Sequence, residues 1–244
     1  MHPHFKKLDS FIFHPNRYFN NIPNLQNYPI FHFGNNYCSS IIKGSSACWK
    51  CGAEWSRPSE LFCGKCQVLQ HPIQKENYFK LFGIEEKFDI DQTFLKNKFR
   101  NLQSLVHPDK FENKTHEEQT ISEEYSSLAN KAFSILQPSL NRAEHLLALK
   151  GHVMGKIDTV DDSSFLMEIM TLNEEIEEAG DNEEKLKVLE EKNKKMLEKL
   201  LEEISSHFKN DDLERVKKSI IKLKYFTSIN GRLNSIFREM GVTN

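Results

Sequence analysis

The fold is decided by the stretch DQTFLKNKFRNLQSLVHPDKFENKTHEEQTISEEYSSLANKAFSIL, residues 91–136. Apolar residues recur at helical spacing from Asp91 onward, and again from about Glu117 to Leu136. Because the residue before a proline is pushed out of the α region, His107-Pro108 ends the first of these patterns. The stretch therefore predicts two antiparallel amphipathic helices joined by a polar loop, a helical hairpin.

Each helix of the hairpin carries one apolar stripe. The first stripe comprises Phe94, Leu95, Phe99, Leu102, Leu105 and Val106, and the second comprises Ile121, Tyr125, Leu128, Ala132, Phe133 and Leu136. A shorter helix is expected before the hairpin, from Asn77 to Gly83. Pro138 ends the second helix of the hairpin.

A glycine-rich linker is predicted further along the chain, at Gly151 and Gly155, and Asp158 to Asp162 follow it. Three further helices are then expected, from about Ser163 to Glu178, from Asn182 to Phe208 and from Asp211 to Met240. Stripes of this length without a heptad repeat indicate an antiparallel three-helix bundle, with a coiled-coil dimer as the lesser alternative and any self-association weak.

Four of the five cysteines form two C-x-x-C pairs, Cys48 with Cys51 and Cys63 with Cys66. Four thiolates can close a tetrahedron around Zn²⁺, with Zn–S distances of about 2.3 Å. A closed four-sulfur site is structural, because no ligand position stays open for a substrate. The pattern predicts a small zinc module, and the alternatives are chance spacing, two disulfides or a redox role.

Glycines beside these pairs, Gly52 and Gly64, are expected to give the turns their backbone freedom. Cys38 stands apart from the pairs and is interpreted as a free thiol without an assigned role. The module is too short to bury a core of its own, so its folding energy is expected to come from the metal.

The loop of the hairpin reads His107-Pro108-Asp109. A structural interpretation suffices for the tripeptide alone, since proline ends a helix and aspartate begins a turn. Its context favours a binding role as well, because Lys96, Lys98 and Arg100 make the preceding helix basic and Asp109 lies at the tip of the hairpin. Pro108 stiffens that tip, so less entropy is lost when a partner binds it.

With these features, residues 76–149 resemble a J domain, which docks on DnaK-class chaperones and triggers ATP hydrolysis. Three further motifs are similar to the HscB type of J protein. They are Asn77-Tyr78-Phe79-Lys80-Leu81-Phe82-Gly83, Pro138-Ser139-Leu140-Asn141-Arg142-Ala143-Glu144-His145-Leu146-Leu147, and Phe165-Leu166-Met167-Glu168-Ile169-Met170 followed by Glu174-Glu175-Ile176. The resemblance covers about residues 76–240, and the cysteine segment looks like the zinc-binding extension of some eukaryotic relatives.

The resemblance implies a co-chaperone of iron–sulfur cluster biogenesis rather than an enzyme. His107, Pro108 and Asp109 would stimulate the ATPase of a DnaK-class chaperone, with electrostatic docking by Lys96, Lys98 and Arg100. The protein would deliver an IscU-type scaffold protein to that chaperone. The alternative is a general J-domain co-chaperone for unfolded clients.

A second apolar surface on the helix from Ser163 fits a binding face. Phe165, Ile169, Leu172 and Ile176 form the stripe expected in the core, which leaves Leu166, Met167 and Met170 on another side. A patch rich in Met suits a docking surface, although burial against a neighbouring helix is the alternative. By the resemblance, Leu166, Met167, Met170 and Glu174 would contact the scaffold, together with Lys224 and Tyr225, where the family more often has Arg and Phe.

The expected organisation has four parts. Residues 1–46 are a presequence or a disordered tail, 47–74 the zinc module, 75–152 the J domain and 158–244 the scaffold-binding bundle. Because residues 1–46 are basic and poor in acids, the expected location is the mitochondrial matrix, with a cytoplasmic pool as the alternative.

Several function classes are disfavoured. The formal net charge of −2 argues against binding to nucleic acid, and no apolar run is long enough for a membrane span. The chain has no catalytic triad, phosphate-binding glycine loop or open metal site, so no enzymatic activity is expected.

Overall fold

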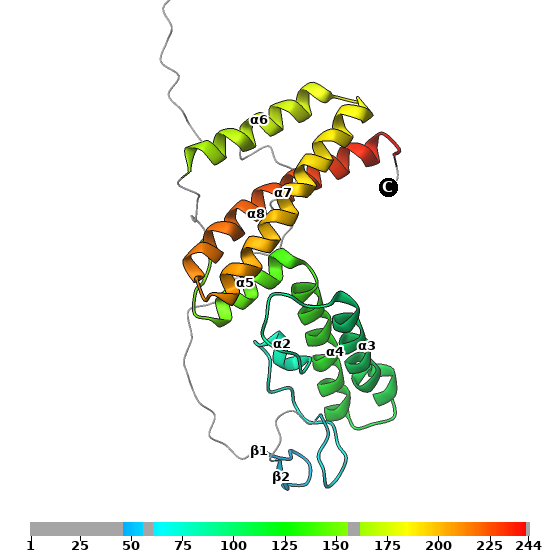
Figure 1. Ribbon diagram of the computed structural model, residues 1–244. Coiled ribbons are helices and arrows are strands. Elements are labelled where there is room, and N and C mark those ends of the chain that lie inside the picture. The colour runs from blue at the N-terminus through cyan, green and yellow to red at the C-terminus, as the bar shows by residue number, and fades with distance from the viewer. Residues whose placement is uncertain (1–45, 56–60, 156–161, 243–244) are drawn as a thin grey trace, which may run out of the picture. The chain divides into compact units, whose positions relative to one another are not determined.

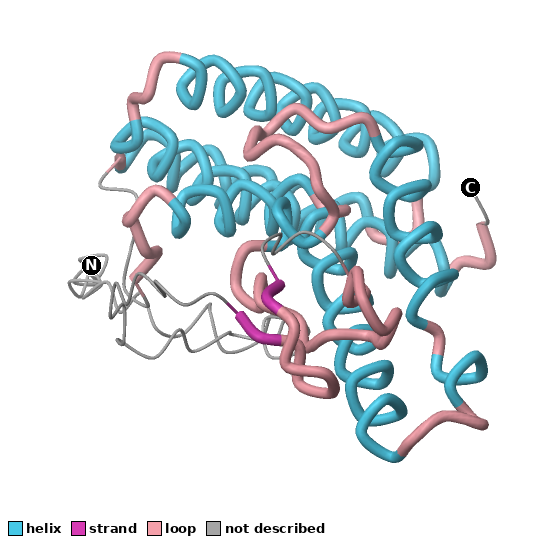
Figure 2. The backbone as a smooth tube through the Cα atoms, turned by 90° about the horizontal axis from the view of Figure 1, so that it is seen from below, coloured by secondary structure: helices cyan, strands magenta, loops and turns pink. Residues whose placement is uncertain are grey.

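The computed structural model of the protein describes residues 46–55, 61–155 and 162–242. Cys38 and the segment read as a presequence, apart from Ser46, lie outside these residues. The expected fold class is confirmed, since the described chain is mainly helical and is preceded by a small cysteine segment (Figures 1 and 2). None of the described helices is both long and apolar enough to cross a membrane.

The cysteine segment holds the two described strands, β1 (Ser46–Ala47) and β2 (Glu54–Trp55), paired antiparallel. Helix α2 (Tyr78–Leu81) is short. The hairpin consists of α3 (Gln92–Val106) and α4 (His116–Leu136), joined through the 3-10 turn η1 (Pro108–Phe111). Helix α5 (Ser139–Leu149) follows, and α6 (Ser163–Ala179), α7 (Glu183–Lys209) and α8 (Leu213–Glu239) form the bundle.

Side-chain caps explain where most of these helices begin. A polar oxygen of the residue before the helix accepts a hydrogen bond from the backbone N–H three positions on, which satisfies one of the free N–H groups of the first turn. The capping residues are Asn77, Asp91, Thr115, Asp162, Asn182 and Asp212. Each expected helix therefore begins within two residues of its predicted start.

Aromatic rings from α3, from α4 and from the residue that follows α2 pack together along one side of the hairpin. Phe99 of α3 stacks on Phe133 of α4 with ring centroids 4.5 Å apart, and it meets the edge of Phe82 at 6.5 Å. Ser122 of α4 donates a hydrogen bond to the carbonyl oxygen of Val106 at 2.7 Å, which ties the two helices together near the loop. The hairpin predicted from the sequence is thus a packed unit.

Gly151, with φ +86°, and Gly155 lie outside the helices as expected of the linker, but the sequence did not predict α5, which occupies residues 139–149 before it. Its apolar side chains face more than one neighbour, since α5 packs against both α4 and α8. The single-sided stripe that reveals a surface helix is therefore absent from its sequence. Figure 1 shows α5 where the hairpin meets the bundle.

Arg142 of α5 anchors the loop that precedes α3. Its guanidinium is buried and donates to the carbonyl oxygens of Phe88 at 2.7 Å and Leu136 at 2.6 Å. The cation also lies 5.3 Å from the centre of the Phe88 ring. One side chain thus holds the corner between α4 and α5 against the loop from α2.

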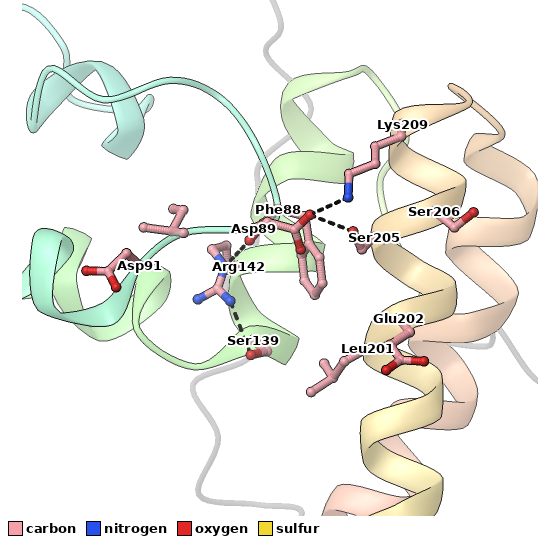
Figure 3. A pocket seen from close by; sticks show the side chains of 11 residues that line it. Phe88, Asp89, Asp91, Ser139, Arg142, Leu201, Glu202, Ser205, Ser206 and Lys209 are labelled. Atoms are coloured by element: carbon pink, nitrogen blue, oxygen red, sulfur yellow. Dashed lines mark hydrogen bonds and ion pairs between the residues drawn. The ribbon is translucent and has the colours of Figure 1, made fainter.

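The same loop contacts the end of α7. Phe88 stacks on Phe208 with centroids 5.8 Å apart. Asp89 accepts a hydrogen bond from Ser205 at 2.6 Å and pairs with Lys209 at 2.9 Å. Phe88, Asp89, Ser205 and Lys209 line an open groove that carries both acidic and basic side chains (Figure 3).

Candidate functional site

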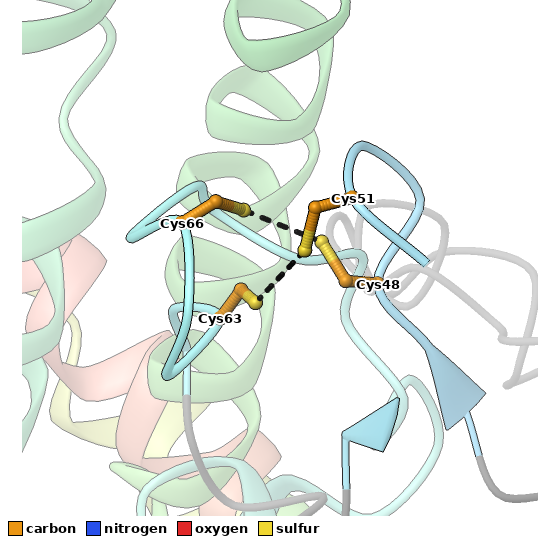
Figure 4. A group of neighbouring side chains, drawn as sticks. All are labelled: Cys48, Cys51, Cys63 and Cys66. Carbon is orange, nitrogen blue, oxygen red and sulfur yellow. Dashed lines mark hydrogen bonds between the residues drawn. The ribbon is translucent and has the colours of Figure 1, made fainter. Parts of the chain in front are cut away.

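The cysteine segment is built from two turns, each carrying one C-x-x-C pair (Figure 4), and the two turns have the same backbone hydrogen bonds. The N–H of Cys48 donates to Ala53, and Gly52 donates back to the carbonyl of Cys48. In the second turn the N–H of Cys63 donates to Val68, and Gln67 donates to the carbonyl of Cys63. All four bonds are 2.8 or 2.9 Å long, so each C-x-x-C pair is held in the same conformation.

The position after the second cysteine of each pair is left-handed. Gly52 has φ +68°, and Gln67 in the equivalent place has φ +56°. The expectation for Gly64 is wrong, because it follows the first cysteine of its pair, where the turn needs no positive φ. Gln67 instead takes the conformation that glycine prefers.

The four sulfur atoms converge on one point. All lie within 4.8 Å of one another, with Cys48 to Cys66 at 3.6 Å and Cys51 to Cys63 at 3.8 Å. A tetrahedral ion with Zn–S bonds of about 2.3 Å requires S–S separations of about 3.8 Å. Disulfide bonds would need about 2.05 Å, and the four residues are free thiols. The arrangement therefore fits a metal site with four sulfur ligands.

The protonation of these thiols favours a cation between them. Burial raises the pKa of Cys48, but the backbone N–H groups of Cys51 and Lys50 outweigh it and lower that pKa to about 6. The backbone at Val68 lowers the pKa of Cys66, whereas burial and the neighbouring thiols raise it to about 12. Cys48 therefore loses its proton readily, whereas the neighbouring thiols oppose the ionisation of Cys66. A cation bound between the sulfur atoms would relieve that repulsion.

Two side chains other than the cysteines connect the sulfur cluster to the helical core. The amide Nε2 of Gln70, which is buried, donates to the sulfur of Cys48 at 3.4 Å and to the Val68 carbonyl at 2.9 Å. The indole N–H of Trp49 donates to the carbonyl oxygen of Leu69 at 2.8 Å. Leu69 is fully buried and belongs to the same apolar core as the helices. The sequence reading did not single out Gln70 or Trp49, whose only signal is their closeness to the cysteines.

Two side chains of the cysteine segment, Lys50 and His71, meet the acidic first half of α4. The ammonium of Lys50 lies 3.8 Å from the buried carboxylate of Glu118. The imidazole of His71 lies 3.3 Å from Glu117 and 3.7 Å from Glu124. His71 therefore faces carboxylates of the hairpin.

The loop tripeptide is exposed at the turn between α3 and α4. The side chains of His107 and Asp109 are 51% and 77% exposed, with His107 Nδ1 3.4 Å from the Asp109 carboxylate. Lys110 donates to the carbonyl oxygen of Ser104, and Phe111 is buried beneath the turn. Pro108 occupies the first position of η1, where a missing N–H costs nothing. The loop thus presents His107 and Asp109 outward from a fixed base.

The three basic residues of α3 do not share one side of the helix. Lys96 and Arg100 are four positions apart and lie together, whereas Lys98 falls on the other flank. The Lys98 ammonium lies 5.3 Å from the centre of the Phe94 ring. Phe94 and Leu105 are 48% and 47% exposed, so placing them in the core stripe with Leu95, Leu102 and Val106 is wrong.

The second apolar surface of α6 lies partly in solvent. The expected core stripe of Phe165, Ile169, Leu172 and Ile176 is buried. Met167 is 65% exposed and Met170 is 39% exposed, on the side of the helix that also carries Glu174. Leu166 is half-buried against the core.

The two residues of α8 expected on this surface turn in different directions. Tyr225 meets the edge of Phe165 at 5.5 Å and so adjoins α6, and burial raises the pKa of its phenol. Lys224 pairs with Glu144 of α5 at 2.5 Å. The structure thus brings Tyr225 to α6 and turns Lys224 toward α5.

Comparisons with known proteins identify the family. The model for the HSCB C-terminal oligomerisation domain matches residues 161–234. The iron-sulfur cluster co-chaperone protein HscB of Homo sapiens is 35% identical over 189 residues, which are 76% of this chain and 80% of the human one. The HscB homolog of Arabidopsis thaliana is 34% identical over 149 residues, which are 61% of this chain and 57% of that one.

The crystal structure of human co-chaperone protein HscB has the same fold, with a TM-score of 0.74 at 34% sequence identity. The match covers 78% of this chain and 98% of the crystallised one. The mainly helical architecture and the sequence agree in this assignment. The chain therefore belongs to the HscB family of iron–sulfur cluster co-chaperones.

Proposed function

We propose that this chain stimulates the ATPase of a DnaK-class chaperone and delivers an IscU-type iron–sulfur scaffold protein to it. The observation that carries the proposal is the exposure of two separate chemical surfaces on one folded unit. His107 and Asp109 stand in solvent at the hairpin turn, and Met167 with Met170 form an apolar patch on α6. An adaptor needs two such surfaces, one for each partner.

The chaperone-facing surface is assigned to His107, Pro108 and Asp109, supported by Lys96, Lys98 and Arg100. The exposed Asp109 carboxylate can accept hydrogen bonds from a partner's cations, and the rigid turn limits the entropy lost on docking. The basic helix would speed association with an acidic partner surface. ATP hydrolysis takes place in the partner, so the chain is proposed to have no catalytic centre of its own.

The scaffold-facing surface is assigned to Leu166, Met167, Met170 and Glu174, with Tyr225 at its edge. Exposed methionines adapt to a partner's apolar side chains, and Glu174 can pair with a cation at the rim. Lys224 is retained in the proposal as a peripheral residue, because its ammonium is engaged by Glu144.

The metal of the cysteine site is proposed to be Zn²⁺, held by Cys48, Cys51, Cys63 and Cys66. When bound, the ion would supply structural stability rather than reactivity, because all its positions are taken by sulfur. The proposed division assigns residues 47–74 to this module, 75–152 to the J domain and 158–244 to scaffold binding. Metal content and stoichiometry of the purified protein, measured by mass spectrometry, test the ion.

The mitochondrial matrix is the proposed location, supported by the basic, acid-poor composition of residues 1–46. Incubation of the full chain with isolated mitochondria tests this. Protection from added protease that depends on the membrane potential is expected, and a chain that stays accessible contradicts it.

Two variants separate the proposed surfaces. Asp109→Asn should abolish ATPase stimulation and leave scaffold binding intact. Replacement of Met167 and Met170 by Ser should weaken scaffold binding and leave basal stimulation intact, with the exposed Val188→Ser of α7 as the matched control. Loss of both activities in either variant, with an unchanged melting temperature, would contradict the two-surface assignment.

A further inference from the structure

Helix α3 exposes two large apolar side chains that its core does not use. Phe94 and Leu105 are 48% and 47% exposed, although both fall within a helix that already buries Leu95, Leu102 and Val106. An amphipathic helix needs one apolar stripe to pack against its domain. Packing within the domain therefore does not explain why Phe94 and Leu105 are apolar, and contact with a partner would explain it.

The two side chains lie on one line along the helix. Eleven residues at 100° each bring Leu105 to within about 20° of Phe94, about 16 Å further along the axis. Lys98 lies on the same flank between them, with its ammonium 5.3 Å from the Phe94 ring centre. We call Phe94, Lys98 and Leu105 the α3 stripe.

The stripe carries one cation, Lys98, and α3 itself has no acidic side chain to oppose it. The fifteen residues of α3 include three basic side chains and no acidic one. A surface with two apolar groups beside the Lys98 cation matches a partner surface with an apolar centre and an acidic rim. A few side chains that become fully buried contribute most of the binding energy in many interfaces, while charges set orientation and association rate.

The stripe is continuous with the loop that carries the proposed ATPase signal. Leu105 lies two residues before His107, whose side chain is 51% exposed. A partner that covers the loop would therefore also reach Leu105, and then Lys98 and Phe94 along the same helix.

We propose that Phe94 and Leu105 are the apolar anchors by which this chain docks on its DnaK-class chaperone, through an acidic partner surface with an apolar centre. This inference rests on the proposed function. The anchors supply affinity that does not depend on salt, Lys98 supplies affinity that does, and Asp109 supplies the stimulation itself.

The test compares the double variant Phe94→Ala with Leu105→Ala, the single variant Lys98→Gln, and Val188→Ala as the control for loss of an exposed apolar side chain. Chaperone ATPase is measured against co-chaperone concentration at several salt concentrations. The double variant should raise the half-maximal concentration on the order of tenfold, reach the wild-type maximum and keep the wild-type salt dependence. Lys98→Gln should flatten the salt dependence, and Val188→Ala should change nothing.

The outcomes separate this inference from the function beneath it. A wild-type chain that stimulates, with an unchanged half-maximal concentration in the double variant, would overturn the anchors alone. A wild-type chain that neither binds nor stimulates the chaperone would overturn both. A second copy of this chain could occupy the stripe instead, and sedimentation of the free protein tests this. A dimer that is lost in the double variant would assign the stripe to that second copy and overturn the chaperone assignment.

Discussion

The Nε2 amide of Gln70 lies 3.4 Å from the sulfur of Cys48, across 22 residues of sequence. A donor aimed at a thiolate stabilises its negative charge and fixes the ligand's direction, as partners behind metal ligands commonly do. Gln70 is almost fully buried, at 2% exposure, and its neighbour Leu69 belongs to the helical core. The metal site and the hairpin are thus joined through two adjacent residues.

Gln70→Ala should release the bound metal faster than the wild type. The substitution removes the donor to Cys48, and loss of such a partner typically weakens metal binding by about tenfold or more. The measurement is transfer of metal to a chromophoric chelator, with Gln74→Ala as the control. Equal release rates for the wild type and Gln70→Ala would mean that the hydrogen bond plays no part in holding the metal.

Gln67→Gly and Gly52→Ala should change stability in opposite directions. Both positions have positive φ, which costs about 1 kcal/mol for a residue with a Cβ. Gln67→Gly removes that cost but also removes the weak hydrogen bond from the Gln67 amide to the Gly64 carbonyl at 3.3 Å. A small net gain in stability is therefore expected. Gly52→Ala introduces the cost. Melting temperatures of the metal-loaded proteins check both, and a destabilised Gln67→Gly would show that the side chain outweighs the strain.

Removal of the metal should lower the melting temperature of the helical core. Trp49, Gln70 and Leu69 connect the cysteine turns to that core, and their packing depends on the turns being held. Chelation, or Cys63→Ser with Cys66→Ser, should therefore shift the helical unfolding transition followed by circular dichroism. A transition that stays in place would show that the module folds independently of the hairpin.

Stability should fall as the pH is lowered from about 6.5 toward 4. Burial lowers the pKa of His145 to about 4, and its Nε2 accepts the backbone N–H of Tyr78 at 3.4 Å while the rings stack at 4.5 Å. The unfolded chain takes up this proton first, so the contribution is complete above the unfolded pKa and is lost as pH falls through the folded one. The full effect is at most about 3 kcal/mol.

Denaturant titrations at pH 7, 6, 5 and 4 measure this dependence. His145→Phe keeps a ring against Tyr78 and cannot titrate, so its stability should vary less with pH in this range. A variant with the same slope as the wild type would assign the acid sensitivity to other groups.

The helix boundaries were predictable from the sequence because their causes are local. Asp91, Asn182 and similar residues cap their own helices, and His107-Pro108 ends α3 by a clash within the chain. The convergence of four cysteines was predictable for the same reason, since each pair needs only a short turn.

The errors arise where distant packing decides. Helix α5 is buried against both α4 and α8, so it lacks the one-sided stripe by which a surface helix is recognised. Phe94 and Leu105 have helical spacing, but only the neighbours of α3 determine which apolar positions are covered. Gln67 adopts positive φ because the second turn repeats the first, which the residue type alone does not indicate.

In the proposed function, one chain couples a scaffold protein to a chaperone's ATPase. The most direct test is the steady-state ATPase rate of a DnaK-class chaperone with this protein, with and without an IscU-type scaffold. A rate with both that exceeds the sum of the separate stimulations is the predicted result. Stimulation that is indifferent to the scaffold would contradict the coupling and favour a J protein that serves unfolded clients in general.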